Sequence, residues 1–554
     1  MSAKKIIICS NFFPPNFVGG AEIVAYNHAK ALQKLGYEVV VFAGDSKPFG
    51  NRHFLRKEIY DDLTVYRVYL QAVDYQPEFI NFCHRDIESD FEKLLNSFNP
   101  DVVHFHNIIG LSLGMIYLAK KCGIRTILTI HDNWGFCHRN TTIKPDGSLC
   151  DDFDECQNCL VCFEDEDSKK IPIFMRKSYF RIMMNYIDYF IFPSCYFATR
   201  YIKAGFSKSK IKVIWNGIDI EKFKEVRNKK NIGVLRVSFI SYFGKHKGGH
   251  VLLDALEAIP KDLKVVVNFV GEGDQEGFYK ERVRSLGNNI SVKWFGKVDN
   301  KQIAKVFNET DVLILPSLWP ENQPVTITEA MASGIPAIAS NFGGTPELID
   351  DKKTGLLFTP GDYKDLSKKI VYLIRNPKIV SRLGENAYRK IKSFSFEKQI
   401  KKNIALYENK IDKKSGLRKK NYLIICVGKF FCEKFTEVIK RISANFKDDR
   451  YNFVMKNWIP DDLLEKADVV WVMDRNSHPE SLNLFLKQGI PMVVPSINVE
   501  LKNYCSFFNC GLHYSTIEEC VMSLNFLLGN VKKTKLIREN AKQLYGKIIG
   551  KKGD

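Results

Sequence analysis

The fold of this chain is decided by one stretch, Thr310-Asp-Val-Leu-Ile-Leu-Pro-Ser-Leu-Trp-Pro-Glu-Asn-Gln-Pro-Val-Thr-Ile-Thr-Glu-Ala-Met-Ala-Ser-Gly-Ile-Pro336. Its short apolar run, residues 312–315, is typical of a strand buried on both faces of a parallel sheet. Residues 325–333 have helical spacing, and Gly334 followed by Pro336 is a common helix stop. A strand, a loop and a helix in this order predict an open α/β sheet, in which ligands bind at the carboxyl ends of the strands.

Two glutamates stand on either side of the predicted helix start. Glu321 lies on the loop, and Glu329 lies a turn into the helix. Carboxylates accept hydrogen bonds from neighbouring hydroxyl groups, which sugars and riboses offer. The unpaired N–H groups and the positive dipole end of the helix suit a diphosphate. The stretch therefore indicates a site for a ligand that carries both kinds of group.

The motifs around the two glutamates carry a specific resemblance. Glu-x7-Glu is followed by Ala-Met-Ala-Ser-Gly-Ile-Pro336, by Gly343-Gly-Thr-Pro-Glu347 and by Thr354-Gly-Leu-Leu-Phe358. This half of the chain resembles the donor half of family 4 retaining glycosyltransferases with the GT-B fold. The alternative is a plain Rossmann-like unit with two surface glutamates. The resemblance implies an α/β architecture of two Rossmann-like domains that face a cleft.

The resemblance also implies a set of donor contacts. Glu321 would hold sugar hydroxyls, Glu329 the ribose and Lys247 the diphosphate, whose developing charge an ammonium can neutralise. Two further loops would hold the base and ribose, largely through backbone groups. The residues expected at the donor are, besides these three, Gly271, Gly273, Phe295, Asn322, Val325, Thr326 and Lys245.

The sequence departs from the family just before Lys247. The usual Gly-Arg pair appears here as Ser241-Tyr242. Either Lys245 supplies the second cation, or the diphosphate is held less tightly. The departure puts the rate and the donor affinity in doubt more than the fold.

The first residues form a βαβ unit by their pattern. Ile6–Cys9 and Glu38–Ala43 read as buried strands, and a helix is expected from about Ala21 to Leu35. Gly19 and Gly20 then lie at the helix N-terminus, where the backbone can approach a phosphate closely. Their position matches the glycine loop of the family's acceptor half.

Two further strands end in polar residues. His104 and His106 belong to the first, and His131-Asp132 follows the second. Strand-end histidines can be structural, but two strands that converge on the expected cleft favour a functional role. The resemblance implies that His106 lies near the transferred sugar and that His131 and Asp132 face the acceptor.

Five cysteines crowd into the loop after the second of these strands. Cys156, Cys159 and Cys162 form two overlapping Cys-x2-Cys spacings, which are typical of a zinc knuckle. No export signal is visible, so thiols or metal ligands are expected here, not disulfides. Some family members carry a similar insertion, which points to Cys137, Cys150, Cys156 and Cys159 as ligands of a structural zinc, with Cys162 as the spare. Free thiols are the alternative, and the acidic run 165–167 is interpreted as a solvated charge run.

The composition is that of an ordinary soluble globular protein with 45% hydrophobic and 26% charged residues. The net charge is +19, yet no nucleic-acid-binding motif is visible, and we expect no nucleic-acid partner. A basic surface that faces anionic lipid or a diphosphate substrate, or a Lys-rich composition without a partner, explains the charge. No apolar run reaches the roughly 18–20 residues that span a bilayer. We expect a cytoplasmic protein, and peripheral association with the inner face of the membrane is a second option.

The 554 residues divide into four predicted parts. These are an N-terminal acceptor domain (1–205) with the Cys-rich insertion (137–167), a donor domain (206–390), a crossover helix (391–412) and an additional Rossmann-like domain (421–550). Residues 377–409 are expected to be helical and amphipathic, like the C-terminal helices that cross back onto the first domain in the family. The last part echoes the donor domain: His478-Pro-Glu480-Ser precedes Gly489-Ile-Pro491. Leu484 stands where Glu329 would be, and no Lys-Gly step follows the first strand, so this part is predicted to be non-catalytic.

Three functions compete. The first is a glycosyltransferase that moves a sugar from a UDP- or GDP-sugar to a hydroxyl acceptor, glycan or lipid-linked, with retention and with no cofactor required for catalysis. The second is a sugar-binding or scaffold protein with a degraded site, which Tyr242 and the extra domain favour. The third, weaker hypothesis is a nucleotide-sugar epimerase. The presence of Glu321, Glu329 and Lys247 together favours the transferase.

Overall fold

The computed structural model describes most of the first three quarters of the chain and parts of the rest. The described residues are 4–408 without 18, 77–81, 83, 152, 154–155, 161, 165–169, 225, 227–233 and 300–301, and beyond them 422–427, 451–456, 469–472, 492–495, 511–514, 523 and 535–542. The chain divides into two compact units, residues 1–409 and 410–554, and each is described by itself. None of the described helices combines the length and the apolar character that a membrane span needs.

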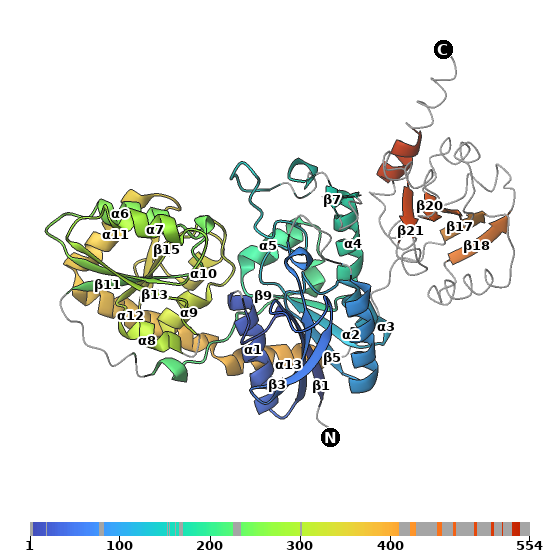
Figure 1. The fold of residues 1–554 in the computed structure, drawn as a ribbon, viewed down its shortest axis with the longest axis horizontal. Coiled ribbons are helices and arrows are strands. Elements are labelled where there is room, and N and C mark those ends of the chain that lie inside the picture. The colour runs from blue at the N-terminus through green and yellow to red at the C-terminus, as the bar shows by residue number, and fades with distance from the viewer. Residues whose placement is uncertain are drawn as a thin grey trace, which may run out of the picture. The chain divides into compact units, whose positions relative to one another are not determined.

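An eight-stranded sheet forms the centre of the N-terminal domain (Figure 1). Its strand order is β10 (Ile211–Val213), β9 (Tyr189–Phe192), β6 (Arg125–Thr129), β5 (Val102–Phe105), β1 (Lys5–Phe12), β2 (Glu38–Asp45), β4 (Leu63–Tyr69) and β3 (Leu55–Tyr60). Only β3 pairs antiparallel. Ile6, Ile7 and Ile8 have no exposed surface, as expected for a central strand with both faces covered. The helices of this domain are α1 (Gly20–Lys34), α2 (Arg85–Phe98), α3 (Gly114–Lys121), α4 (Ile173–Asn185) and α5 (Cys195–Lys203).

The donor domain is built on a six-stranded parallel sheet. Its strand order is β13 (Ile290–Gly296), β12 (Val265–Val270), β11 (Leu235–Ile240), β14 (Val312–Leu315), β15 (Ala337–Ser340) and β16 (Gly355–Phe358). The helices are α6 (Gly249–Glu257), α7 (Glu276–Val283), α8 (Ile303–Asn308), α9 (Val325–Ala332), α10 (Thr345–Leu348), α11 (Tyr363–Arg375) and α12 (Pro377–Ile391). Two separate apolar clusters contain residues of this sheet. The strand order reverses between β11 and β14, which is the point where doubly wound sheets bind ligands.

This pair of parallel-sheet α/β domains confirms the predicted GT-B architecture. The strand 312–315 has the predicted bounds, and α9 begins at the predicted residue. Gly334 follows α9 with a φ of 70°, a left-handed conformation that ends the helix at little cost for glycine.

The stretch 377–409, predicted to be helical, consists of two helices. A 3-10 turn (η8, Lys392–Phe394) and the extended Ser395 separate α12 from α13 (Phe396–Glu408). The helix is interrupted because the backbone pairs elsewhere: the N–H of Ile218 bonds to the carbonyl of Phe394, and Ile218 bridges to Ser395. The helix α13 then returns to the N-terminal domain beside α1, where Ile400, Leu406 and Tyr407 join its core (Figure 1).

The second unit contains a five-stranded parallel sheet. Its order is β18 (Tyr451–Lys456), β17 (Tyr422–Val427), β19 (Val469–Val472), β20 (Met492–Pro495) and β21 (Gly511–Tyr514). This order is that of the donor domain without its edge strand β13, and the echo of the donor domain stays a prediction. The residues on which the loss of the donor chemistry was argued, 478–491 with Leu484, lie outside the described residues.

Candidate active site

The first feature of the site is an ion pair between two loops of the donor domain. Lys247 lies in a short 3-10 turn (η6, Lys245–Lys247) after β11, and Glu321 lies in the loop after β14. The Lys247 Nζ is 2.7 Å from the Glu321 Oε1, and the two side chains are 17% and 11% exposed. The sequence predicted that both residues serve the donor, and the structure brings them together at the point where the strand order reverses.

Three donors converge on one oxygen of Glu321. Besides the ammonium of Lys247, the Ser317 hydroxyl and the Trp319 indole N–H each donate to Oε1 at 2.7 Å. Within the described part of the chain, Oε2 receives no such bond. Lys247 also lies over the Trp319 ring, 4.4 Å from its centroid. The carboxylate is therefore fixed by one oxygen and offers the other.

Glu321 is ionised in this setting. Burial by itself would raise the pKa of its carboxyl group, but the Lys247 charge and the donated hydrogen bonds outweigh it and hold the pKa below its ordinary value. A buried carboxylate that has lost its water needs such compensation. At neutral pH the site thus presents one negative and one positive charge side by side.

Close backbone packing determines where Lys247 stands. Gly248 has a φ of 73°, and a Cβ at this position would lie 1.9 Å from the carbonyl oxygen of Pro316. Only glycine allows this approach, so the β11 loop rests directly on the β14 loop.

The loop that carries Glu321 is bonded to the N-terminal domain. The Asn322 Oδ1 is 2.6 Å from the Ser194 Oγ, and the Asn322 Nδ2 donates to the carbonyls of Ile130 (2.9 Å) and His131 (3.3 Å). Asn322 was predicted to contact the donor. Its side-chain amide is already engaged in these bonds, so a donor contact, which remains a prediction, would have to use the backbone.

A second contact between the domains involves Glu347 of α10. Its carboxylate accepts the backbone N–H groups of Cys195 (2.9 Å) and Tyr196 (2.8 Å), the first residues of α5. A carboxylate at a helix N-terminus pairs with groups that the helix itself leaves unbonded. Together with Asn322, it fixes the donor domain against β6 and α5.

The remaining predicted donor residues lie around this centre. Glu329 is 4% exposed and lines a cavity of about 90 Å³ that is also bordered by Ile23 and Asn27 of α1. Gly20 lies at the start of α1 against Val325, so the glycine loop and the start of α9 meet. The other positions are as follows: Thr326 in the first turn of α9, Gly271 and Gly273 after β12 with φ of 137° and 158°, Phe295 within β13, and Lys245 exposed in η6. Their contacts with a donor stay predictions.

The strand-end histidines form a buried row. The His106 Nδ1 is 2.9 Å from the His131 Nε2, and their rings stack with centroids 5.2 Å apart. The His106 Nε2 is 3.5 Å from the Nδ1 of His28, a residue of α1. His106 is 1% exposed, with both ring nitrogens engaged, whereas His131 is partly exposed. This geometry favours His131 over His106 as the histidine that reaches a sugar.

Sequence reasoning missed two members of this row. His28 and Tyr407 contact each other, with the Tyr407 hydroxyl 2.9 Å from the His28 Nε2 and 2.7 Å from the His104 Nδ1. A signal for His28 was present: it lies between Ala25 and Ala29 on the apolar face of α1, where a polar residue needs a partner. Nothing in the sequence indicated that α13 would bring Tyr407 to the same place.

Burial keeps all of these histidines neutral. It lowers the pKa of His28 to about 3 and that of His131 to about 4. It also holds the pKa values of His104 and His106 well below their ordinary range, with smaller contributions from the neighbouring histidines.

Two carboxyl groups near the row behave in the opposite way. Asp132 accepts the Trp134 N–H (2.8 Å) and an Asn107 amide proton (3.1 Å), and Glu22 accepts the Gly19 N–H (2.9 Å). Burial raises the pKa of each to about 7, and the charge of Glu22 contributes to the shift of Asp132.

The four predicted zinc ligands surround one cavity. Cys137, Cys150, Cys156 and Cys159 line a space of about 40 Å³. Among the described residues, no three of these sulfurs lie within 4.8 Å of one another. A tetrahedral zinc with Zn–S bonds of about 2.3 Å needs S–S distances of about 3.8 Å. The set of donors fits zinc, whereas the sulfurs stand wider apart than a bound ion would hold them.

Cys162, the spare cysteine, begins a short strand (β7, Cys162–Glu164) that pairs with β8 (Lys170–Pro172). Residues 165–167, the acidic run, lie outside the described part.

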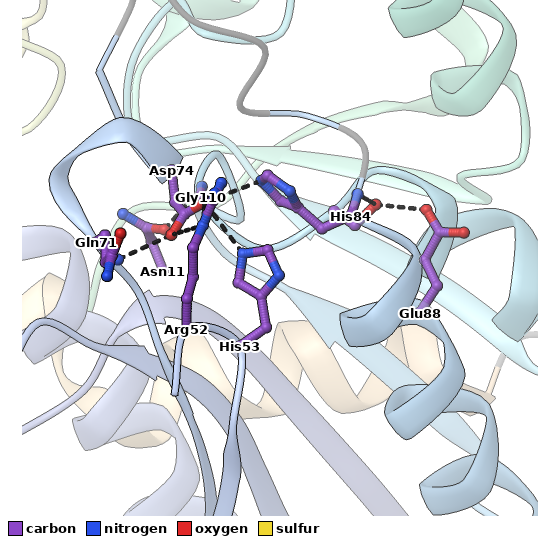
Figure 2. A network of polar contacts seen from close by, with 9 residues as sticks. Asn11, Arg52, His53, Gln71, Asp74, His84, Glu88 and Gly110 are labelled. Carbon is purple, nitrogen blue, oxygen red and sulfur yellow. Dashed lines mark hydrogen bonds and ion pairs between the residues drawn. The ribbon is translucent and has the colours of Figure 1, made fainter. Parts of the chain in front are cut away.

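A further polar cluster in the N-terminal domain surrounds Asp74 (Figure 2). Arg52 donates to Asp74 at 2.6 Å, and the His53 Nε2 is 3.1 Å from the same oxygen. Burial alone would raise the pKa of Asp74, but the bonds from His53 and Arg52 lower it to about 2. His84 approaches from the other side at 3.7 Å. The charge of Arg52 neutralises that of Asp74. The cluster therefore holds the segment 52–53 against the segment 71–74.

Comparison with known families agrees with this geometry. Residues 18–222 match the model named Glycosyltransferase Family 4, and residues 219–390 match the model named Glycosyl transferases group 1. Together they span well over half of the chain. The chain is a GT-B glycosyltransferase.

Three curated relatives show how far the likeness extends. An uncharacterised 41.2 kDa protein from the cps region of Klebsiella pneumoniae is 31% identical over 36% of this chain and 54% of its own length. An uncharacterised glycosyltransferase of Methanocaldococcus jannaschii is 24% identical over 74% of this chain and 100% of its own length. A UDP-Gal:alpha-D-GlcNAc-diphosphoundecaprenol alpha-1,3-galactosyltransferase of Escherichia coli is 26% identical over 57% of this chain and 77% of its own length.

Solved structures show the same fold. Sucrose-phosphate synthase from Thermosynechococcus elongatus superposes with a TM-score of 0.53 at 19% identity, over 73% of this chain and 98% of that one. Anabaena HepE in complex with UDP and glucose gives a TM-score of 0.51 at 18% identity, over 73% and 98%.

The raised pKa of Glu22 predicts a pH-dependent stability. The folded state keeps the proton that the unfolded state loses above about pH 4.5, so the stabilisation is present below that pH and is lost as the pH rises through about 7. The change Glu22→Gln keeps the Gly19 bond and removes the titration. We expect the variant to gain stability over the parent between pH 5 and pH 8, by on the order of 3 kcal/mol for a shift of this size.

Urea unfolding at pH 5 and at pH 8 measures the effect, with Glu281→Gln, an exposed carboxylate, as the matched control. An equal stability difference at both pH values would show that Glu22 does not keep its proton.

Proposed function

We propose that this glycosyltransferase moves a sugar from a nucleotide-diphosphate sugar to a hydroxyl acceptor with retention of configuration. The observation that supports the proposal most is the buried Lys247–Glu321 pair, held at the strand-order reversal and one residue away from the Asn322 bonds to the His131 backbone. An ion pair on a loop that is bonded to the backbone of a partly exposed histidine is suited to a ligand that carries a diphosphate and several hydroxyls.

Each residue has a role that its geometry supports. Lys247 would neutralise the charge that develops on the departing diphosphate. Glu321 would accept sugar hydroxyls through Oε2, since Oε1 already takes three donors. Glu329 would hold the ribose. Retention follows the family resemblance, in which the donor diphosphate itself takes the acceptor proton.

The relatives support a choice of substrates. One solved neighbour was crystallised with UDP and glucose, and the Escherichia coli relative is named for UDP-galactose and a diphosphoundecaprenol-linked acceptor. We propose a UDP-sugar, with a GDP-sugar as the alternative, and a glycan or lipid-linked acceptor. The activity then belongs to surface polysaccharide or glycoconjugate synthesis at the cytoplasmic face of a membrane.

A degraded sugar-binding protein is the second candidate. Tyr242, which stands where the family has an arginine, is 50% exposed and supplies no charge. The paired Lys247 and Glu321 weigh against this reading, because a site without selection for turnover has no need to bury an ion pair.

The catalytic assignment is tested by alanine substitution. Lys247→Ala and Glu321→Ala should each lower kcat by about a hundredfold or more, as the loss of one charged transition-state contact does. Glu329→Ala should chiefly raise the donor KM, because a ribose contact is equal before and during the reaction. Released nucleotide diphosphate over a panel of donors is the readout, and the exposed Lys261→Ala is the control. Unchanged kinetics in Lys247→Ala would reject the assignment.

We also propose that Cys137, Cys150, Cys156 and Cys159 hold a structural zinc, which would close their loop around the ion. Purified protein should contain about one equivalent of zinc by elemental analysis. Cys156→Ala should lose it, while Cys122→Ala, an exposed cysteine outside the loop, should keep it. Metal-free protein of full stability would identify the cysteines as free thiols, and iron would indicate a cluster instead.

The second unit is proposed to bind an acceptor chain, a partner enzyme or the membrane surface without taking part in the chemistry. The division of the chain after Asn409 places a natural truncation point there. A chain ending at Asn409 should keep its activity on a small soluble acceptor, while action on the natural acceptor should fall. Loss of nucleotide-sugar binding would instead show that this unit helps to build the donor site.

A further inference from the structure

A continuous line of hydrogen bonds runs from the crossover helix to the cleft. It begins at Tyr407 and Asn403 of α13, whose hydroxyl and amide lie 2.9 Å and 3.3 Å from the His28 Nε2. It continues from the His28 Nδ1 to the His106 Nε2 (3.5 Å) and from the His106 Nδ1 to the His131 Nε2 (2.9 Å). Tyr407, His28 and His106 are buried, and only the last ring of the line is partly exposed.

The two groups of α13 give this line a direction. The Asn403 amide is placed with Nδ2 towards the ring and Oδ1 buried without a hydrogen-bond partner. In this placement Nδ2 donates, the His28 Nε2 accepts, and the proton of neutral His28 lies on Nδ1. His28 then donates to the His106 Nε2, and His106 in turn donates from Nδ1 to the His131 Nε2. The proton of His131 is thereby placed on Nδ1, since a neutral imidazole carries only one.

The side branch through His104 agrees with this direction. Tyr407 donates its single proton to the His28 Nε2 and accepts from the His104 Nδ1 at 2.7 Å. The His104 Nε2 then accepts from the Thr129 hydroxyl, also at 2.7 Å. No proton is counted twice, and the single lone pair of the His28 Nε2 is shared by two donors, the Tyr407 hydroxyl and the Asn403 amide.

The backbone at the end of the line is bonded to the residue that follows Glu321. The His131 carbonyl accepts the Asn322 amide, and Asn322 is the neighbour of Glu321 in the chain. Within the described residues, no group bonds to the His131 Nδ1. That nitrogen is therefore the point at which the line can donate a proton to a bound oxygen.

We propose that His28, His106 and Tyr407 are positioning residues of the transferase, which hold His131 as the Nδ1–H tautomer so that it donates a hydrogen bond to an oxygen of the bound sugar or acceptor. This inference rests on the proposed function. It assigns a role in the active site to the crossover helix, whose Tyr407 lies at the opposite end of the line from the substrate.

A metal ion is the competing explanation for such a cluster, because ring nitrogens of His28, His104 and His106 lie within 4.8 Å of one another. All six ring nitrogens of these three residues already take part in hydrogen bonds, however. The rings are satisfied without an ion, and binding one through all three residues would break at least two of these bonds.

The tautomer is tested first, by a measurement that does not depend on turnover. In full-length protein labelled with 15N-histidine, the His131 signals are assigned by their loss in His131→Gln. We expect the Nδ1 of His131 to be protonated and the Nε2 to be unprotonated. In Asn403→Asp the donor beside the His28 Nε2 becomes an acceptor, the line reverses, and the proton of His131 should move to Nε2. An Nε2–H form of His131 in the parent protein overturns the proposal.

The second measurement is kinetic. Tyr407→Phe keeps the ring and removes one orienting bond, so kcat should fall about tenfold, as for one lost hydrogen bond, with the donor KM unchanged. Tyr372→Phe, an exposed tyrosine on α11, is the control. A kcat equal to that of the parent, with unchanged His131 signals, overturns the proposal. If Tyr407→Phe lowers kcat, raises KM and also lowers the thermal unfolding temperature, the role of Tyr407 is merely structural, and the proposal is overturned.

The two readouts also separate this inference from the proposed function. If no donor is turned over but the His131 proton moves in Asn403→Asp, the transferase assignment fails and the directed line stands. Metal in stoichiometric amount that persists in Cys156→Ala protein and is lost in His28→Gln would replace the line by a metal site.

Discussion

The arrangement of the site depends on where one loop is fixed, the segment from Pro316 to Pro324 between β14 and α9. At its base the Pro316 carbonyl touches Gly248 and so brings Lys247 within 2.7 Å of Glu321. At its tip Asn322 bonds to the end of β6 and to α5. One short loop thereby connects the sheet of the donor domain, the charged pair and the histidine row. A shift of this loop would alter all three together.

Burial, and the partners that compensate it, decide which side chains near the cleft are charged. Glu321 stays ionised because Lys247 and two neutral donors compensate its burial. At Glu22 and Asp132 burial outweighs the hydrogen bonds that they accept and, at Asp132, the charge of Arg176, so both keep their protons up to about pH 7. The histidines lose their charge for the same reason. The interior around the cleft is thus nearly neutral, and the Lys247–Glu321 pair stands out as the polar centre.

The sequence was sufficient for features that depend on local pattern. The strand 312–315, the start of α9 and the GT-B class follow from apolar runs, a glycine stop and motif spacing, and the structure agrees with each. The position of the break between α12 and α13 was not predictable, since Ser395 pairs with Ile218, which is far away in the sequence. For the same reason His28 and Tyr407 escaped notice: their partners are 78 or more residues away along the chain. His106 was identified by its place at a strand end, but its burial, which makes it an inner member of the row, depends on α1 and α13.

The contacts of Asn322 and Glu347 have a kinetic consequence. Any opening of the cleft that moves the donor domain away from α5 must break the three bonds of Asn322 and the two of Glu347. Each net bond is worth about 1 kcal/mol, so together they stabilise the present arrangement by several kcal/mol and would slow an opening that breaks them all. In the proposed reaction, the amide that places Glu321 would then also delay any product release that requires the two domains to separate.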